Sequence, residues 1–237
     1  MSIAVTPLPR RVASLLGLLA CLGALHCAVA VAAEGRLYPS GPPNGVAYLR
    51  FVNLTSQEVT IVSPAAKIAI PADDAHRVGE FDPVTPGVAL NGSAQLGEAT
   101  KPINVTLTAN EFVTVAVTAD GADGIALTVF RETPSDFNAL KSSLALFNAD
   151  KDCAKAQLVA GDNHQTVIPD VAPGAIGRRL VNPVDAELGV ACADPAQAAP
   201  AKLGQLAAGD RYSIFVVAGK SGPKAVAQRD EQAPFRP

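Results

Sequence analysis

A few side chains have the type and spacing to do chemistry, but they do not form a complete catalytic set. Asp73 and His76 show the D-x-x-H spacing found in the acid–base half of some Ser-His-Asp esterases. Such an enzyme also needs a nucleophilic serine in a glycine-rich turn. The chain has no G-x-S-x-G motif, and Gly161-Asp162-Asn163 places asparagine where that serine would stand. We therefore expect a solvated polar loop at residues 73–76 and assign no catalytic residue.

The sequence also lacks the motifs that would bind a metal ion or a cofactor. The sequence contains no H-E-x-x-H, no Cys₂His₂ spacing, no EF-hand loop, no P-loop and no dinucleotide fingerprint. We assign no metal ligand and no cofactor. Arg178 and Arg179 could meet an anionic polymer, although a pair of exposed arginines at a strand edge is the commoner arrangement.

Four cysteines divide into two pairs. Cys21 and Cys27 lie in an apolar N-terminal stretch, which leaves Cys153 and Cys192 in the body of the chain. In an oxidising compartment two such cysteines most simply form a disulfide. A metal or redox site is the alternative, and the absence of a C-x-x-C motif disfavours it.

Composition limits the class of protein. The chain has 237 residues, of which 49% are apolar, and its formal charge is −3. This near-neutral charge disfavours nucleic acid as a partner. The 19 glycines and 19 prolines suit many turns and disfavour long helices. The chain is long enough for one large domain or two small ones.

The first 33 residues are typical of a secretory signal peptide. Arg10 and Arg11 precede a long apolar run that ends in small residues, and polar residues begin at Glu34. We expect cleavage near Ala33 and an exported mature protein. An uncleaved membrane anchor and a lipoprotein with lipidated Cys21 are the alternatives. Without residues 1–33 the formal charge becomes −5, because two arginines and no acids are lost.

The body of the chain is patterned as β-strands. Apolar residues alternate with polar or small ones at residues 47–52, 113–118 and 125–130, which is typical of half-buried strands. In the first run Ala47, Leu49 and Phe51 should point one way, and Tyr48, Arg50 and Val52 the other. Two Asp-Gly pairs in residues 119–124 predict a hairpin turn.

The pattern occurs twice. Residues 49–53 (LRFVN) are similar to residues 144–148 (LALFN), and residues 107–112 are similar to residues 206–212 if one residue is inserted. We predict an all-β chain of two tandem antiparallel sandwiches, Ig-like or jelly-roll-like, each with about seven strands. They would span residues 34–134, which include a Leu-Tyr arm, and residues 135–237. One larger barrel is the alternative. The disulfide would stabilise the second sandwich.

The first residues of the mature chain carry a family resemblance. Residues 37–53 resemble the AlgF-type alginate O-acetylation proteins of Gram-negative bacteria, which share a Leu-Tyr opening, a Pro-x-Gly and an aromatic–aliphatic–Arg–x–x–Asn strand. The matching positions are Leu37, Tyr38, Pro43, Gly45, Tyr48, Arg50 and Asn53. Lys141, Ser142, Leu144 and Asn148 correspond loosely to the opening of the family's second domain. The cysteine pair and two longer loops depart from the family pattern.

The resemblance implies a periplasmic, non-catalytic adaptor for O-acetylation of an exported polysaccharide, in alginate biosynthesis or cellulose acetylation and hence in biofilms. Its partners would be a membrane-bound O-acyltransferase, an SGNH-type periplasmic acetyltransferase and the polysaccharide itself. The alternatives are a β-sandwich module for glycan binding or adhesion, and a covalent acetyl carrier.

The candidate partner-binding residues are Leu37, Tyr38, Pro43, Tyr48, Arg50 and Asn53, because aromatic and arginine side chains make good interface anchors. An alternative remains open for two of them. Tyr38 could hold the N-terminal arm on the first sandwich, and Arg50 could pair with a neighbouring strand.

Overall fold

The protein is described by a computed structural model covering residues 45–121, 124–135 and 137–234. Its regular structure is almost entirely β, as expected from the alternating pattern and the many turn residues. The described strands are β1 (Ala47–Asn53), β2 (Val59–Val62), β3 (Lys67–Ile70), β4 (Asp82–Val84), β5 (Ala89–Leu96), β6 (Ala99–Thr106), β7 (Phe112–Asp120), β8 (Gly124–Glu132), β9 (Ser142–Asn148), β10 (Ala156–Ala160), β11 (Gln165–Val171), β12 (Ile176–Val181), β13 (Leu188–Cys192), β14 (Ala199–Ala201), β15 (Arg211–Gly219) and β16 (Gly222–Arg229). A single-turn 3-10 helix, η1 (Pro195–Gln197), precedes β14. Within this described part, no helix has the length and hydropathy to cross a membrane.

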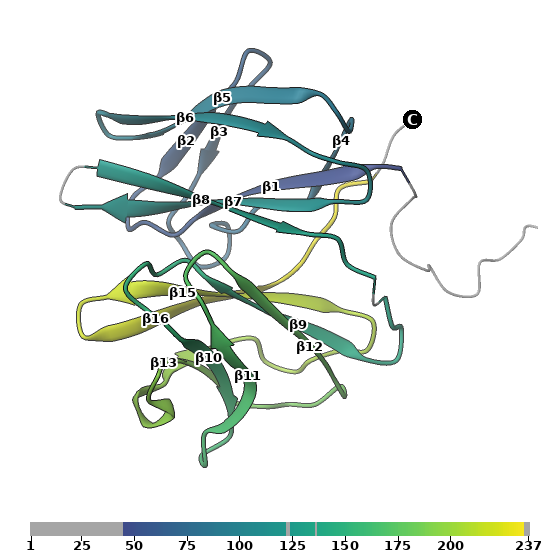
Figure 1. Ribbon diagram of the computed structural model, residues 1–237, viewed down its shortest axis with the longest axis vertical. Helices are drawn as coiled ribbons and strands as arrows, with labels where there is room; N and C mark the ends of the chain where they lie inside the picture. The colour runs from purple at the N-terminus through teal and green to yellow at the C-terminus, as the bar shows by residue number, and fades with distance from the viewer. Residues whose placement is uncertain (1–44, 122–123, 136, 235–237) are drawn as a thin grey trace, which may run out of the picture. The chain divides into compact units, whose positions relative to one another are not determined.

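The strands form four sheets that pair into two sandwiches (Figure 1). The first sandwich consists of sheets β4-β1-β7-β8 and β3-β2-β5-β6, and the second of β12-β9-β15-β16 and β11-β10-β13-β14. Adding eight to each strand number of the first sandwich gives the order in the second, so the two have one topology. Residues 133–141 connect β8 to β9. The expected all-β, two-sandwich architecture is thereby confirmed.

Sheet register corrects two details of the expected repeat. β1 runs parallel to β7, and β9 runs parallel to β15, so the sheets are not purely antiparallel. The two strands of each parallel pair are not consecutive in the sequence. Between them the chain crosses to the other sheet, and it then comes back to pair with the first strand. Tyr48 pairs with Phe112, and Ser143 pairs with Arg211. Phe112 and Arg211 are therefore equivalent, and the one-residue insertion that aligned Phe112 with Tyr212 is wrong.

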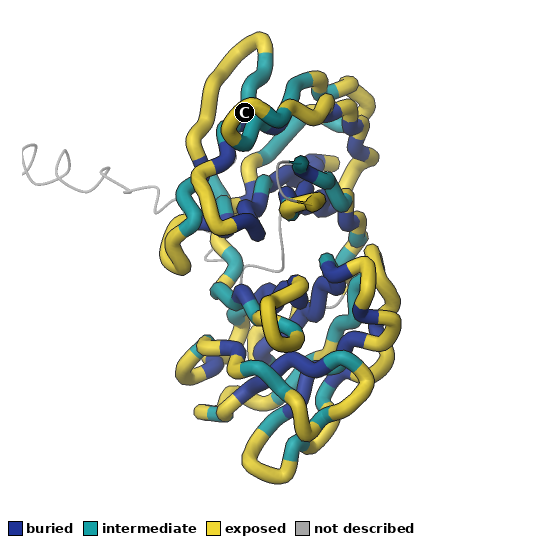
Figure 2. Tube along the Cα trace, turned by 90° about the vertical axis from the view of Figure 1, so that its left-hand side faces the viewer, coloured by how far each residue is buried: buried dark blue, intermediate teal, exposed yellow. Residues whose placement is uncertain are grey.

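Each sandwich encloses an apolar core made by alternate residues of its strands. In β1, Ala47 and Leu49 face the core of the first sandwich, as the alternation predicts. In β9, the equivalent strand, Leu144 and Leu146 face the core of the second. Figure 2 shows that buried segments lie in the interior, whereas the outer turns of the chain are exposed.

A third apolar cluster joins the two sandwiches. It combines Val52, Ala116 and Phe130 of the first with Phe147 and Phe215 of the second, among other residues. The Phe147 and Phe215 rings stack with centroids 4.7 Å apart, while the Phe130 ring meets Phe147 edge-on at 5.3 Å. Consequently β1 and β9 are buried on both faces. The described residues all belong to one compact unit.

The expected disulfide joins Cys153, in the turn after β9, to Cys192, the last residue of β13. The two Cα atoms lie 5.4 Å apart, and the bond closes a loop across 39 sequence positions. Cys153 is buried in the core of the second sandwich. The first sandwich has no cysteine in its described residues.

We predict that replacing Cys153 and Cys192 by serine lowers the free energy of unfolding by about 4 kcal/mol, because the unfolded chain regains loop entropy. Urea unfolding of the oxidised protein and of the double variant measures the difference. Reductant should destabilise the wild type to the same extent and leave the variant unchanged. A loss below about 1 kcal/mol would contradict a stabilising role for the bond.

Candidate functional site

The residues singled out in the sequence fall into two groups. Leu37, Tyr38 and Pro43 lie outside the described residues. Tyr48, Arg50 and Asn53 lie on β1 and have exposed fractions of 2%, 1% and 0%.

The buried side chains of β1 are inside the protein rather than on a surface that a partner could touch. Tyr48 stacks on Phe112, with ring centroids 4.7 Å apart, and burial raises the pKa of its hydroxyl. β1 is a central strand of its sheet, with packed side chains on both faces, so this segment contributes to architecture.

Arg50 lies at the junction between the two sandwiches, and each of its three guanidinium nitrogens donates a hydrogen bond. Its Nε donates to Thr114 Oγ1 at 2.9 Å, within the same sheet. One terminal nitrogen donates to Ser213 Oγ at 2.7 Å, and the other donates to Asp230 Oδ1 at 2.8 Å. The guanidinium carbon also lies 4.0 Å from the centre of the Phe81 ring. Arg50 therefore joins one sandwich to the other by direct hydrogen bonds.

The internal repeat explains why Arg50 bonds one hydroxyl side chain in each sandwich. Thr114 and Ser213 occupy equivalent positions on β7 and β15, so Arg50 bonds the same site in both copies. Ser213 also donates to Asp230 Oδ1 at 2.6 Å. A buried guanidinium is costly unless it has a counterion and its donors are satisfied. Asp230 supplies the charge, and the two hydroxyls help to satisfy the donors.

The segment that follows β16 returns to the first sandwich. Phe81 donates its backbone N–H to Glu231 O at 2.8 Å and accepts from Ala233 N at 3.0 Å. Gln232 and Phe81 form an isolated parallel bridge. Residues 230–233, which we call the strap, thus supply the counterion of Arg50 and also pair with the backbone of the first sandwich.

A second ion pair crosses the junction. Arg178 of β12 bonds Glu132 of β8 at 2.6 Å and also donates to Ser143 Oγ at 2.8 Å. Both charged side chains are 14% exposed. Arg178 is therefore paired within the protein, whereas its neighbour Arg179 donates to Val167 O at 2.7 Å. Neither contact was visible in the sequence, where the arginines only suggested a strand edge or an anionic partner.

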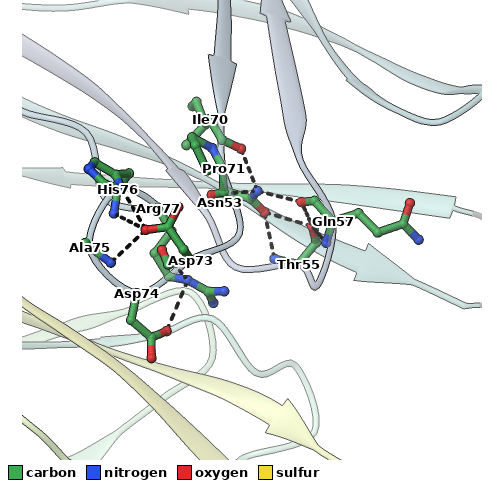
Figure 3. Close-up of polar contacts among 10 residues, drawn as sticks. All are labelled: Asn53, Thr55, Gln57, Ile70, Pro71, Asp73, Asp74, Ala75, His76 and Arg77. Atoms are coloured by element: carbon green, nitrogen blue, oxygen red, sulfur yellow. Dashed lines mark hydrogen bonds and ion pairs between the residues drawn. The ribbon is translucent and has the colours of Figure 1, made fainter.

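Asn53 closes the end of β1 by bonding the loops around it (Figure 3). Its side-chain N–H groups donate to the carbonyls of Gln57, Ile70 and Pro71 at 2.7, 2.9 and 3.2 Å. Its oxygen accepts from the backbone N–H and the hydroxyl of Thr55. These bonds tie one sheet of the sandwich to the loops that lead into and out of the other.

In the second sandwich, Asn148 holds the equivalent loops in the same way. Asn148 donates to Cys153 O at 2.7 Å and to Val171 O at 2.9 Å, and its oxygen accepts from Asp150 N. The similarity between residues 49–53 and 144–148 thus reflects one structural task performed twice.

The D-x-x-H pair belongs to an exposed turn (Figure 3). Asp73 Oδ1 lies 2.7 Å from His76 Nδ1 and accepts from the backbone N–H groups of Ala75 and His76. The hydrogen bond from His76 is the main cause that lowers the pKa of Asp73. Both side chains are more than half exposed, which fits the solvated loop expected from the sequence.

The other histidine of the described residues, His164, lines a depression of about 490 Å³ at one end of the second sandwich, together with Asp162, Asp185 and Lys202. No group of three or more His, Cys, Asp or Glu side chains in the described ranges is arranged to hold a metal ion.

Known proteins give little to compare with this arrangement. No family model and no curated protein sequence matches the chain. One solved structure, from Bacteroides uniformis and provisionally described as a cell adhesion protein, aligns with 80% of this chain and 100% of its own. The identity is 8% and the TM-score is 0.26, so the alignment carries no argument about function.

We predict that Arg50→Met destabilises the protein by about 3–5 kcal/mol, because it leaves the Asp230 carboxylate buried without its counterion. Denaturant unfolding measures the loss. Arg229→Met is the matched control, since that arginine is 56% exposed and its ion pairs are worth less than about 1 kcal/mol. Adding Asp230→Leu to Arg50→Met should recover part of the stability. Equal losses for the two arginine variants would contradict the junction's role.

We also predict that Asn53→Ala lowers the free energy of unfolding by about 3 kcal/mol, because buried carbonyl groups lose their donors. Gln57→Ala serves as the control and should change stability by less than about 0.5 kcal/mol, since Gln57 is exposed and bonds Asn53 only through its backbone carbonyl. Thermal unfolding of both variants gives the comparison. A loss for Asn53→Ala no larger than the control's would show that the loops hold without the amide.

Proposed function

We propose that this protein is a periplasmic, non-catalytic adaptor for O-acetylation of an exported polysaccharide. It would link a membrane-bound O-acyltransferase to an SGNH-type periplasmic acetyltransferase. The first support for this proposal is the resemblance of residues 37–53 to the AlgF-type family.

The second support is the way in which the two sandwiches are joined. An adaptor must hold two partners at a fixed separation, and freely hinged domains would not do this. Here the sandwiches share the apolar cluster around Phe147 and Phe215, the Arg50–Asp230 pair and the Arg178–Glu132 pair. The single observation that carries the proposal is that Arg50, a residue of the resemblance motif, itself bonds both sandwiches.

Two sandwiches joined in this way have ample surface for two partners. Loops and sheet edges at the outer ends of the sandwiches are natural contact sites, because the junction side of each sandwich is already covered.

We predict that deleting the gene removes O-acetyl groups from an exported polysaccharide and leaves the polymer's length unchanged, because the adaptor would act on acetyl delivery and not on polymerisation. The ratio of acetyl to sugar, measured by NMR of the purified polymer, provides the readout. A plasmid copy of the wild-type gene should restore acetylation. Unchanged acetylation in the deletion strain would refute the proposal.

Affinity capture of the mature protein from envelope extract tests the partners separately. An O-acyltransferase or an SGNH-type transferase in the eluate is the expected result. If the protein instead binds purified polysaccharide saturably and captures neither enzyme, the glycan-binding alternative replaces the adaptor.

A further inference from the structure

The first sandwich has an apolar groove along one side. The groove has a volume of about 420 Å³ and lies between β3 and β4, which are edge strands of the two sheets. Its lining includes Leu49, Phe51, Ile61, Ile68, Val84 and Leu90. Ile68 pairs with the buried Ile61 and so belongs to the inner face of its sheet, yet it is 47% exposed. The described residues therefore leave part of this inner face uncovered.

The second sandwich is covered on the corresponding side by its own residues. Its edge strands β11 and β12 are longer than β3 and β4. Ile168 of β11 is 4% exposed and lies against Gly177 of β12, where a Cβ atom would meet the Ile168 side chain at 2.5 Å. Arg179 of β12 donates to Val167 O of β11 at 2.7 Å and so bridges the two edges. The same topology therefore does not require a groove.

An acidic side chain stands where the second sandwich has its bridging arginine. Leu49 pairs with Asp82, and its equivalent Leu144 pairs with Arg179. Asp82 is exposed, and it is the one charged residue in the described lining of the groove. It makes no hydrogen bond or ion pair with a described residue, and desolvation raises the pKa of its carboxyl group. The groove thus combines an apolar floor with a carboxylate that a cation would complement.

The backbone of β3 carries hydrogen-bonding groups that point away from its own sheet. Among the described strands, β3 pairs only with β2, so its other edge has no strand beside it. At the hairpin end, Ser63 N–H donates to Ala66 O at 2.8 Å. Bonded pairs alternate along an antiparallel ladder, so Ile68 bonds β2, whereas Lys67 and Ala69 direct their N–H and C=O groups outward. This edge can therefore accept a further strand.

The opposite rim of the groove is less suited to strand addition. β4 has only three residues, and its central residue, Pro83, has no N–H group to offer an added strand. A strand added to β3 would place alternate side chains on the same face as Ile68, because residues paired across two strands share a face of the sheet. That face is the inner one, so these side chains would enter the groove and lie opposite Asp82.

We propose that β3 binds an extended segment of a partner protein as an additional strand, with alternate apolar side chains of that segment in the groove and a basic residue beside Asp82. Main-chain hydrogen bonds to Lys67 and Ala69 would provide affinity, and the groove would select the side chains. The inference goes beyond the proposed function, because it states the form and chemistry of the partner's segment and holds whichever process the partner serves.

The probe is a phage-displayed library of random peptides, selected on the full mature chain. The selected peptides should alternate apolar residues and carry a lysine or arginine. Ala69→Pro removes one outward N–H, keeps the bonds to β2, and should weaken their binding by about tenfold. Thr100→Pro is the matched control, because Thr100 on the edge strand β6 has the orientation of the native Pro102, and it should change affinity by less than about twofold. A library that yields no such peptide, or equal effects of the two prolines, would overturn the proposal.

A double-mutant cycle tests the charge. Asp82→Asn in the protein and replacement of the peptide's basic residue by glutamine should each weaken binding by about fivefold. The two changes together should cost little more than either one alone, because the groups that they remove bind each other. Losses that multiply would show that the basic residue does not lie beside Asp82 and would contradict this placement of the strand.

Amide hydrogen exchange followed by NMR gives a readout that needs no variant. The bound peptide should slow exchange at Lys67 and Ala69, whose N–H groups it would engage, and leave exchange at Ile68 unchanged, because that N–H already bonds β2. Unchanged exchange at Lys67 and Ala69 would overturn the proposal. If the same protection appears without peptide as the protein concentration rises, the edge belongs to a second copy of this chain, and the proposal of a separate partner fails.

Discussion

A buried guanidinium is the constraint on which the rest of this structure depends. Arg50 carries a full charge into the junction between two apolar layers, where a charge without partners is strongly disfavoured. Its partners come from three places: β7 of its own sheet, β15 of the other sandwich and the strap after β16. These three must assemble together for the charge to be compensated. The interaction therefore specifies one arrangement of the sandwiches, whereas the surrounding phenylalanine cluster supplies the apolar burial.

The two sandwiches share a topology but differ in the interactions that stabilise them. Both use an asparagine at the end of the first strand to hold the following loops, at Asn53 and Asn148. Within the described residues, only the second adds a disulfide and an arginine bridge between its edge strands β11 and β12. The first sandwich instead has short edge strands and a groove. The second sandwich is thus covered on the side that corresponds to the groove, and the first has an apolar opening there.

The buried positions of the motif change what the family resemblance means. Tyr48, Arg50 and Asn53 perform structural tasks: stacking, joining the sandwiches and holding loops. These tasks belong to the architecture of this protein, and none of them requires a partner. Any surface that meets a partner must then lie on exposed loops and edges, which vary more readily because their side chains do not support the core.

The sequence by itself determined the features that depend on residues close together in the chain. Alternation with period two gave the strands and their faces, Asp-Gly pairs predicted the β7–β8 turn, and the LRFVN and LALFN segments revealed the repeat. Two isolated cysteines were enough to predict their bond. Only the tertiary structure decided the rest. Arg50 and Asp230 are 180 positions apart, and Arg178 and Glu132 are 46 apart. No local pattern marks these partners, because contacts at such separations are chosen by how whole sheets pack.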